Sequence, residues 1–203
     1  MFNTDVEITY IKGYKKMDGS MYTQRNKQIN SRTGVYELVL TGIMAGLVLA
    51  ATSFFKIPVP ATNGYIHLGD ALIFISVIVL GRRDGTIAAA SGSALADLLG
   101  GYAHWAPWTF VIKGLMAFVA ATIYYSLDHS DTSDKTMNRV KETAAFAAGG
   151  LVMMAGYFIA QRVIYGTLAA PLAALPGNVI QAACGVIIAE AVSVPLSRSG
   201  IIK

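Results

Sequence analysis

Charged side chains are scarce in this chain, where Asp, Glu, Lys and Arg make up 14% of 203 residues and hydrophobic types 54%. Soluble domains are about 25% charged. The basic residues lie beside apolar runs instead of forming one face with interleaved aromatics, which excludes a nucleic-acid-binding surface. We therefore predict a polytopic membrane protein whose surroundings are a lipid bilayer.

Cysteine is also nearly absent. The single residue, Cys184, excludes an intrachain disulfide and a cysteine metal cluster. The acidic segment from Asp128 to Asp134 contains one histidine, and we interpret it as a solvated loop and not as a metal site. We expect no metal and no cofactor in this chain.

The usual hydrolase and nucleotide-binding motifs are missing. There is no Gly-x-Ser-x-Gly, no His-Glu-x-x-His and no phosphate-binding Gly-x-x-x-x-Gly-Lys. We expect a protein that is not an enzyme, and any ATP would be used by partner subunits. An intramembrane aspartic hydrolase that uses Asp70 and Asp97 stays open as an alternative. So does a stand-alone secondary transporter or channel.

Long apolar runs dominate what is present. The first 34 residues are polar and basic, without the apolar core of a signal peptide, and we predict a disordered cytoplasmic tail there. Residues 35–203 form the predicted transmembrane domain. Six runs follow the tail, at about residues 36–55, 66–81, 85–101, 106–127, 143–165 and 176–196. We predict an all-α fold with six transmembrane helices.

Positive charge gives the expected orientation, because Lys and Arg accumulate on the cytoplasmic side of membrane proteins. With six spans, the basic tail, Arg82 and Arg83, the 135–141 connection and the C-terminus fall on one side. We therefore expect both termini in the cytoplasm.

Two polar clusters interrupt the apolar runs, one at residues 63–70 and one at 97–108. Ionisable groups at membrane depth are expensive and indicate a functional site. The expected topology puts both clusters near the outer face. The candidate substrate-binding residues are Asn63, Tyr65, His67, Asp70, Asp97, Tyr102, His104, Trp105, Lys113 and Arg162.

These residue types suit a flat heteroaromatic ligand, because rings can stack on it and polar groups can orient it. We expect Asp97 to pair with Lys113, since a buried charge alone costs too much. Asp70 and Arg162 form a second possible pair. Either pair has a structural or a ligand-binding interpretation. Residues 56–64 are interpreted as a loop, because Pro58 and Pro60 forbid regular helix.

Small residues recur every four positions in the first run, at Gly42, Gly46 and Ala50. Such a stripe allows close helix packing in lipid. Taken alone, it fits packing within the bundle and docking of a partner subunit equally well.

Two stretches resemble a known family. Lys-Ile-Pro-x-Pro…Asn-Gly-Tyr-Ile-His-Leu-Gly-Asp-Ala at 56–71 is similar to the S components of energy-coupling factor (ECF) transporters. So is Gly-Ser-Ala-Leu-Ala-Asp-Leu-Leu-Gly-Gly-Tyr…Ala-Pro-Trp-Thr-Phe-x-Ile-Lys-Gly at 92–114. The resemblance covers roughly residues 35–200 and is closest to the hydroxymethylpyrimidine and pyridoxine group.

The resemblance implies a substrate-capture subunit in a prokaryotic plasma membrane. Such a subunit binds a small vitamin in an outward-facing pocket that residues 56–66 close. It delivers the vitamin through a transmembrane coupling protein and two cytoplasmic ATPases, and Gly42, Gly46 and Ala50 would dock that coupling protein. Hydroxymethylpyrimidine or pyridoxine is the favoured substrate, with riboflavin or another thiamine precursor as the alternative.

Overall fold

The computed structural model describes residues 19–54, 56–59, 64–127 and 135–199. The predicted site residue Asn63 and the acidic loop 128–134 lie outside this part of the chain. By internal contacts the chain divides into two units, residues 1–39 and residues 40–203. The second unit contains every site residue discussed below.

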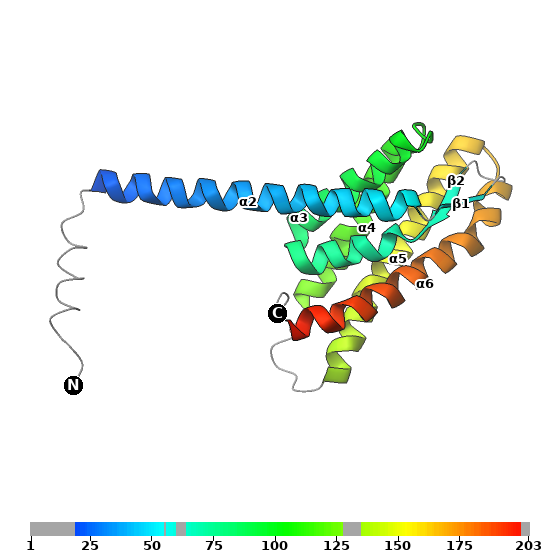
Figure 1. Cartoon of the computed structure of the whole chain (residues 1–203). Coiled ribbons are helices and arrows are strands. Elements are labelled where there is room, and N and C mark those ends of the chain that lie inside the picture. Colours follow the sequence, from blue (N-terminus) through cyan, green and yellow to red (C-terminus); the bar gives the residue numbers. More distant parts are fainter. Residues whose placement is uncertain (1–18, 55, 60–63, 128–134, 200–203) are drawn as a thin grey trace. The chain divides into compact units, whose positions relative to one another are not determined.

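Five helices and one β-hairpin make up the described residues (Figure 1). The first helix, α2, begins inside the segment predicted to be a tail. The elements are α2 Gly19–Phe54, β1 Lys56–Val59, β2 Gly64–His67, α3 Gly69–Leu99, α4 Ala106–Ser126, α5 Lys135–Tyr165 and α6 Ala169–Arg198.

The prediction of six transmembrane helices is wrong. Within the described ranges there are five helices, and four of them hold a segment that is long and apolar enough to span a membrane. Those segments are Gly34–Phe54, Ala106–Ser126, Thr136–Tyr165 and Ala169–Ser197. The expected orientation, with both termini in the cytoplasm and the polar clusters near the outer face, was based on six crossings and is no longer supported by that count.

The missing helix is explained by α3, which includes both short runs predicted at 66–81 and 85–101. Gly81 interrupts α3 with φ of 86°, a conformation that glycine adopts without steric cost. The Ser76 hydroxyl then donates to the Gly85 carbonyl at 3.2 Å. A straight helix would separate these residues by ~13.5 Å along its axis, so α3 folds back on itself at Gly81.

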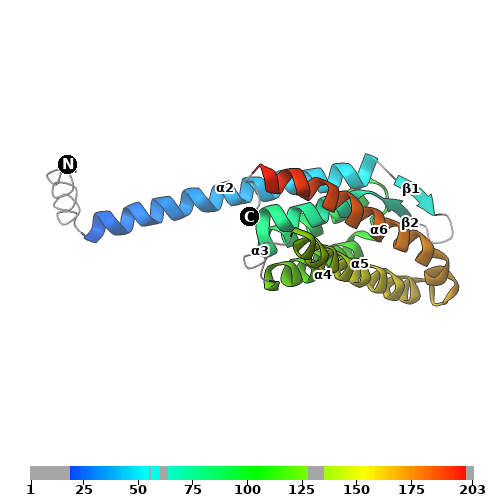
Figure 2. The same cartoon turned by 90° about the horizontal axis from the view of Figure 1, so that it is seen from below.

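The segment predicted as a loop is a β-hairpin that connects α2 to α3. Its strands are antiparallel and place Lys56 opposite His67. The backbone N–H of His67 donates to the Gln181 side chain in α6 at 3.0 Å. In both views the hairpin lies beside the end of the bundle where α5 ends and α6 begins (Figures 1 and 2).

Close helix packing depends on small residues. An added Cβ at Gly156 of α5 would lie 2.9 Å from the Ile112 side chain of α4. One at Gly185 of α6 would lie 2.9 Å from the Asp70 Cβ of α3. In lipid, close contact of this kind holds helices together. Both close approaches bring polar residues of neighbouring helices together at the site.

Candidate functional site

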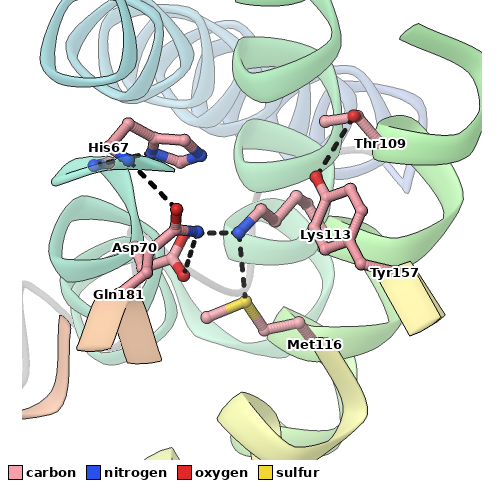
Figure 3. Close-up of polar contacts among 8 residues, drawn as sticks. His67, Asp70, Thr109, Lys113, Met116, Tyr157 and Gln181 are labelled. Atoms are coloured by element: carbon pink, nitrogen blue, oxygen red, sulfur yellow. Dashed lines mark hydrogen bonds and ion pairs between the residues drawn. The ribbon is translucent and has the colours of Figure 1, made fainter. Parts of the chain in front are cut away.

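A buried ion pair forms the charged end of the site (Figure 3). Lys113 Nζ lies 2.5 Å from Asp70 Oδ1, and both side chains are 0% exposed. Gln181 Nε2 donates to the other oxygen, Oδ2, at 3.0 Å. Both carboxylate oxygens of Asp70 therefore have donors, as a buried charge requires.

Each partner comes from a different helix. Asp70 lies in the first turn of α3, where the helix dipole favours a negative charge. Lys113 lies two turns into α4, and Gln181 comes from α6, one turn before Gly185. The close approach of α6 to Asp70 at Gly185 thus allows Gln181 to reach the carboxylate.

His67 joins the hairpin to this network. Its backbone N–H donates to Gln181 Oε1, and its Nδ1 accepts a hydrogen bond from the Gly69 N–H at 3.0 Å. Burial, and next the positive charge of Lys113, lower the pKa of His67 to about 3. The imidazole is therefore neutral near pH 7, and its proton is on Nε2, because Nδ1 is an acceptor.

A second, neutral group of residues begins beside Lys113, and we call it the neutral end. Trp105, the residue that precedes α4, is followed at intervals of four by Thr109 and Lys113, so the three lie on one side of the helix. The facing residue of α5 is Tyr157, whose ring centroid lies 5.9 Å from that of Trp105. Its hydroxyl lies 3.2 Å from Thr109 Oγ1, and Lys113 Nζ lies 5.5 Å from its ring centroid.

The neutral end also includes Gln161, one turn beyond Tyr157 on α5 and 5% exposed. Its Oε1, like the Nε1 of Trp105, is buried without a hydrogen-bond partner among the residues that the structure describes. Trp105 is only 4% exposed, so it is not a residue of an interfacial aromatic belt.

Asp97 lies in a different environment from the predicted one. The expected Asp97–Lys113 pair is wrong, because the ion pair of Lys113 is with Asp70. Burial lowers the pKa of Lys56 and the negative charge of Asp97 raises it, so Asp97 acts on the hairpin. Lys56 Nζ also donates to the Ala96 carbonyl at 3.3 Å and lies 5.6 Å from the Tyr102 ring centroid.

The predicted site residues therefore divide into groups. His67, Asp70 and Lys113 are brought together, Trp105 lies at the neutral end, and Asp97 and Tyr102 lie near Lys56. Arg162 and His104 are exposed, and no ion pair joins Arg162 to Asp70. Tyr65 belongs to β2, and its side chain is outside the described part. The role of each residue in binding stays a prediction.

Four residues at the site are absent from the predicted set, namely Thr109, Tyr157, Gln161 and Gln181. A signal for three of them exists in the sequence. Thr109 lies four residues from both Trp105 and Lys113, and Gln161 lies four residues from Tyr157, so each pair shares a helix face.

The small-residue stripe lies on an open part of α2. Gly42 and Gly46 are exposed, and a Cβ added at either would meet no atom of the described residues within 4 Å. Ala50 is half-buried. Packing of Gly42 and Gly46 within this chain is therefore not seen in the described residues.

Asp70 fits poorly into an aspartic dyad. Such a dyad holds two carboxylates close enough to share one proton. Asp70 instead accepts from Lys113 and from Gln181 with its two oxygens. The hydrolase alternative receives no support from this geometry.

Known proteins resemble this chain in sequence and in fold. Residues 32–198 match the family model of the ECF-type riboflavin transporter, S component. An uncharacterized protein in a gap 3′ region of Pyrococcus woesei is 34% identical over 141 residues, covering 70% of this chain and 88% of that protein. The thiamine precursor transporter HmpT of Lactococcus lactis is 28% identical over 170 residues, covering 83% of this chain and 92% of HmpT.

A solved structure supports the same fold. The S component of a bacterial ECF transporter superposes with a TM-score of 0.59 at 16% identity, covering 81% of this chain and 97% of that one. At this identity the likeness shows the fold alone. With 167 of 203 residues inside the family model, the chain is a multi-pass membrane protein and belongs to the ECF-type S-component family.

Proposed function

We propose that this chain captures a small heteroaromatic vitamin or vitamin precursor for import, with hydroxymethylpyrimidine as the favoured substrate. The observation that carries the proposal is the polar network of Asp70, Lys113, Gln181 and His67, buried among apolar helices beside the hairpin. Its continuation into the aromatic pair Trp105 and Tyr157 supports a flat ligand, since rings stack on rings.

The choice of substrate is supported by the relatives. HmpT is named as a thiamine precursor transporter and matches 83% of this chain. Pyridoxine, with a ring of similar size, is the next candidate. The description of the matching family model favours riboflavin as a further candidate.

The direction of capture follows from the helix ends. Arg82 and Arg83 lie at the bend of α3, and Arg139 and Lys141 lie in the first two turns of α5. Trp105 and Gln161 lie near the opposite ends of α4 and α5. Because Lys and Arg accumulate in the cytoplasm, these positions support a site that opens to the outside.

ATP-driven import would need partners, because the sequence holds no phosphate-binding Gly-x-x-x-x-Gly-Lys. We propose a transmembrane coupling protein and two cytoplasmic ATPases. The exposed Gly42 and Gly46, with Ala50, form the proposed docking stripe. The hairpin is the proposed lid, held at its base by Lys56 and His67.

Calorimetric titration of the purified chain tests the proposal. We expect saturable binding of hydroxymethylpyrimidine, pyridoxine or riboflavin at a stoichiometry of about one, and mass spectrometry of the co-purifying small molecule should agree. Lys113→Met should abolish binding, whereas Arg83→Met, exposed at the bend of α3, should keep it. Failure of every B-vitamin and precursor to bind would contradict the proposal.

A further inference from the structure

Two buried polar atoms of the neutral end lack the hydrogen bonds that buried groups normally make. They are the Nε1–H of Trp105 and the Oε1 of Gln161, in side chains 4% and 5% exposed. No partner for either lies among the described residues. Unpaired buried groups cost free energy, and each such group in a native structure needs an explanation.

These two atoms differ from two buried hydroxyls that also lack partners among the described residues. Thr52 and Ser93 also have unpaired hydroxyls, but both lie inside helices, where a hydroxyl can rotate onto a carbonyl of the preceding turn. An indole N–H donates only in the plane of its ring, and an amide oxygen only accepts. Local rotation of a hydroxyl therefore offers no equivalent solution for Trp105 and Gln161.

Both residues are neighbours of Tyr157, one across the helix interface and one along the same helix. Trp105 packs against Tyr157 with ring centroids 5.9 Å apart, and Gln161 lies one turn from Tyr157 on the same helix. The Tyr157 hydroxyl is already engaged by Thr109. The group thus presents one donor and one acceptor beside an aromatic surface.

The charged end limits what charge a ligand can carry. Asp70 and Lys113 neutralise one another, and Gln181 occupies the remaining carboxylate oxygen. The side chains of the neutral end are Trp105, Thr109, Tyr157 and Gln161, none of them ionised near pH 7. A phosphate would therefore add a buried negative charge beside Tyr157, where the negative charge of Asp97 already acts, which is costly.

We propose that Trp105 and Gln161 read one edge of an uncharged flat ring that carries an acceptor next to an N–H donor. The Trp105 Nε1–H donates to a ring nitrogen, and Gln161 Oε1 accepts from the neighbouring amino group. This edge is the amidine edge of a 4-aminopyrimidine. The inference rests on the proposed function and deepens it, because it assigns the recognition to two residues and excludes phosphorylated forms.

Calorimetry with two matched ligands tests the assignment without any variant. The probes are 4-amino-5-hydroxymethyl-2-methylpyrimidine and the same compound without the amino group. Loss of one buried hydrogen bond, with an unpaired acceptor left behind, is worth about 10- to 100-fold in affinity. We expect wild type to bind the deaminated probe that much more weakly, and not to bind the phosphate ester of the amino compound.

Variants then locate the effect. Gln161→Met keeps side-chain length and removes the acceptor, so the two probes should bind it within about 3-fold of each other. Trp105→Phe keeps an aromatic ring, and should weaken both probes because both retain the ring nitrogen. The matched controls are Trp108→Phe and Thr122→Val, on the same helix, and they should bind both probes like wild type.

The outcomes separate the inference from the function that it rests on. If wild type binds neither probe nor any other vitamin, the proposed function fails and the inference fails with it. If wild type binds both probes equally, or binds the phosphate ester as tightly, the function stands and the inference is overturned. If Gln161→Met is too unstable to purify, the wild-type comparison of the two probes still decides, because equal binding of the two overturns the inference.

Discussion

The charged end and the neutral end of the site differ in how completely their polar groups are paired. Around Asp70, Lys113, Gln181 and His67, an ion pair and hydrogen bonds connect four elements of the fold. Around Tyr157, the Trp105 N–H and the Gln161 carbonyl have no partner in the described part of the chain. One end is complete without a ligand, and the other is not.

This difference suggests different roles for the two ends. A buried network of one ion pair and several hydrogen bonds joins α3, α4, α6 and the hairpin. It gains little from a ligand, because the ligand would have to displace an existing partner. In the proposal made above, the neutral end gains hydrogen bonds when a ligand binds. The charged end would then be the scaffold, and the neutral end would recognise the ligand.

Breaking the scaffold should have the largest effect. Asp70→Asn or Lys113→Met leaves the other residue of the pair as a buried charge without its partner, which costs about 3–5 kcal/mol of stability. The double variant removes both charges and should be more stable than the sum of the two losses predicts. Thermal unfolding in detergent measures this coupling.

The control for these variants is Arg83→Met, an exposed change at the bend of α3 that should alter stability by less than about 0.5 kcal/mol. Strictly additive losses in the double variant would show that Asp70 and Lys113 do not depend on one another.

Separating α6 from α3 should have the next largest effect. Gly185→Leu places a side chain where even a Cβ lies 2.9 Å from the Asp70 Cβ. Overpacking of this kind costs about 1–3 kcal/mol, and it should move Gln181 away from Asp70. Unfolding and ligand titration should both respond.

The matched glycine is Gly114 of α4, where an added Cβ would lie 3.4 Å from the Ala90 Cβ. Gly114→Ala should be nearly neutral, because its steric cost is small and alanine favours helix. Equal effects of the two substitutions would contradict the close-approach role of Gly185.

Acid should weaken the hairpin attachment through His67. Its pKa is lowered to about 3 in the folded protein, by burial and by the charge of Lys113, against about 6.5 unfolded. Below pH 6.5 the unfolded chain therefore binds a proton that the folded chain does not. The free energy of unfolding therefore decreases as the pH is lowered below 6.5, by up to about 1.4 kcal/mol per pH unit.

Unfolding between pH 6.5 and 5 measures this slope. The charge of Asp70 raises the pKa of His67, whereas the charge of Lys56 lowers it further. The slope therefore reports on His67 together with these charged neighbours. His67→Gln should flatten the curve in this window. An unchanged slope in that variant would assign the acid sensitivity to other residues.

The hairpin base should give the smallest effect. Lys56→Met removes the hydrogen bond to Ala96 and the contact with the Tyr102 ring, at a partly exposed position. A cation–π contact of this kind is worth about 0.5–1 kcal/mol, so ligand should dissociate about 2- to 5-fold faster. Stopped-flow exchange measures the rate, with Arg83→Met again as the control, and an unchanged rate would argue against a lid held at Lys56.

Three helices could be predicted from the sequence, with close bounds for α4 alone, because α5 and α6 begin at Lys135 and Ala169 and not at residues 143 and 176. The runs at 106–127, 143–165 and 176–196 correspond to α4, α5 and α6, because an unbroken apolar run of this length has one low-energy form in lipid. The two shorter runs were taken as separate helices, and both belong to α3. The turn at Gly81 is a backbone conformation that hydropathy does not encode.

The members of the site were easier to predict than their partners. Asp70, Lys113, His67 and Trp105 are conspicuous because polar or aromatic groups interrupt apolar sequence. That Lys113 pairs with Asp70, and that Asp97 lies near Lys56, depends on how α3 turns and how closely α6 approaches it. Such contacts join residues 43 and 111 positions apart, and no local pattern specifies them.

The most direct test of the two-ended site is an experimental structure of the chain bound to 4-amino-5-hydroxymethyl-2-methylpyrimidine. The ring should pack against Trp105 and Tyr157, with its ring nitrogen near Trp105 Nε1 and its amino group near Gln161 Oε1. The Asp70–Lys113 pair should be unchanged. A ligand that separates Lys113 from Asp70, or that binds away from Tyr157, would contradict the proposal that the charged end is a scaffold and the neutral end recognises the ligand.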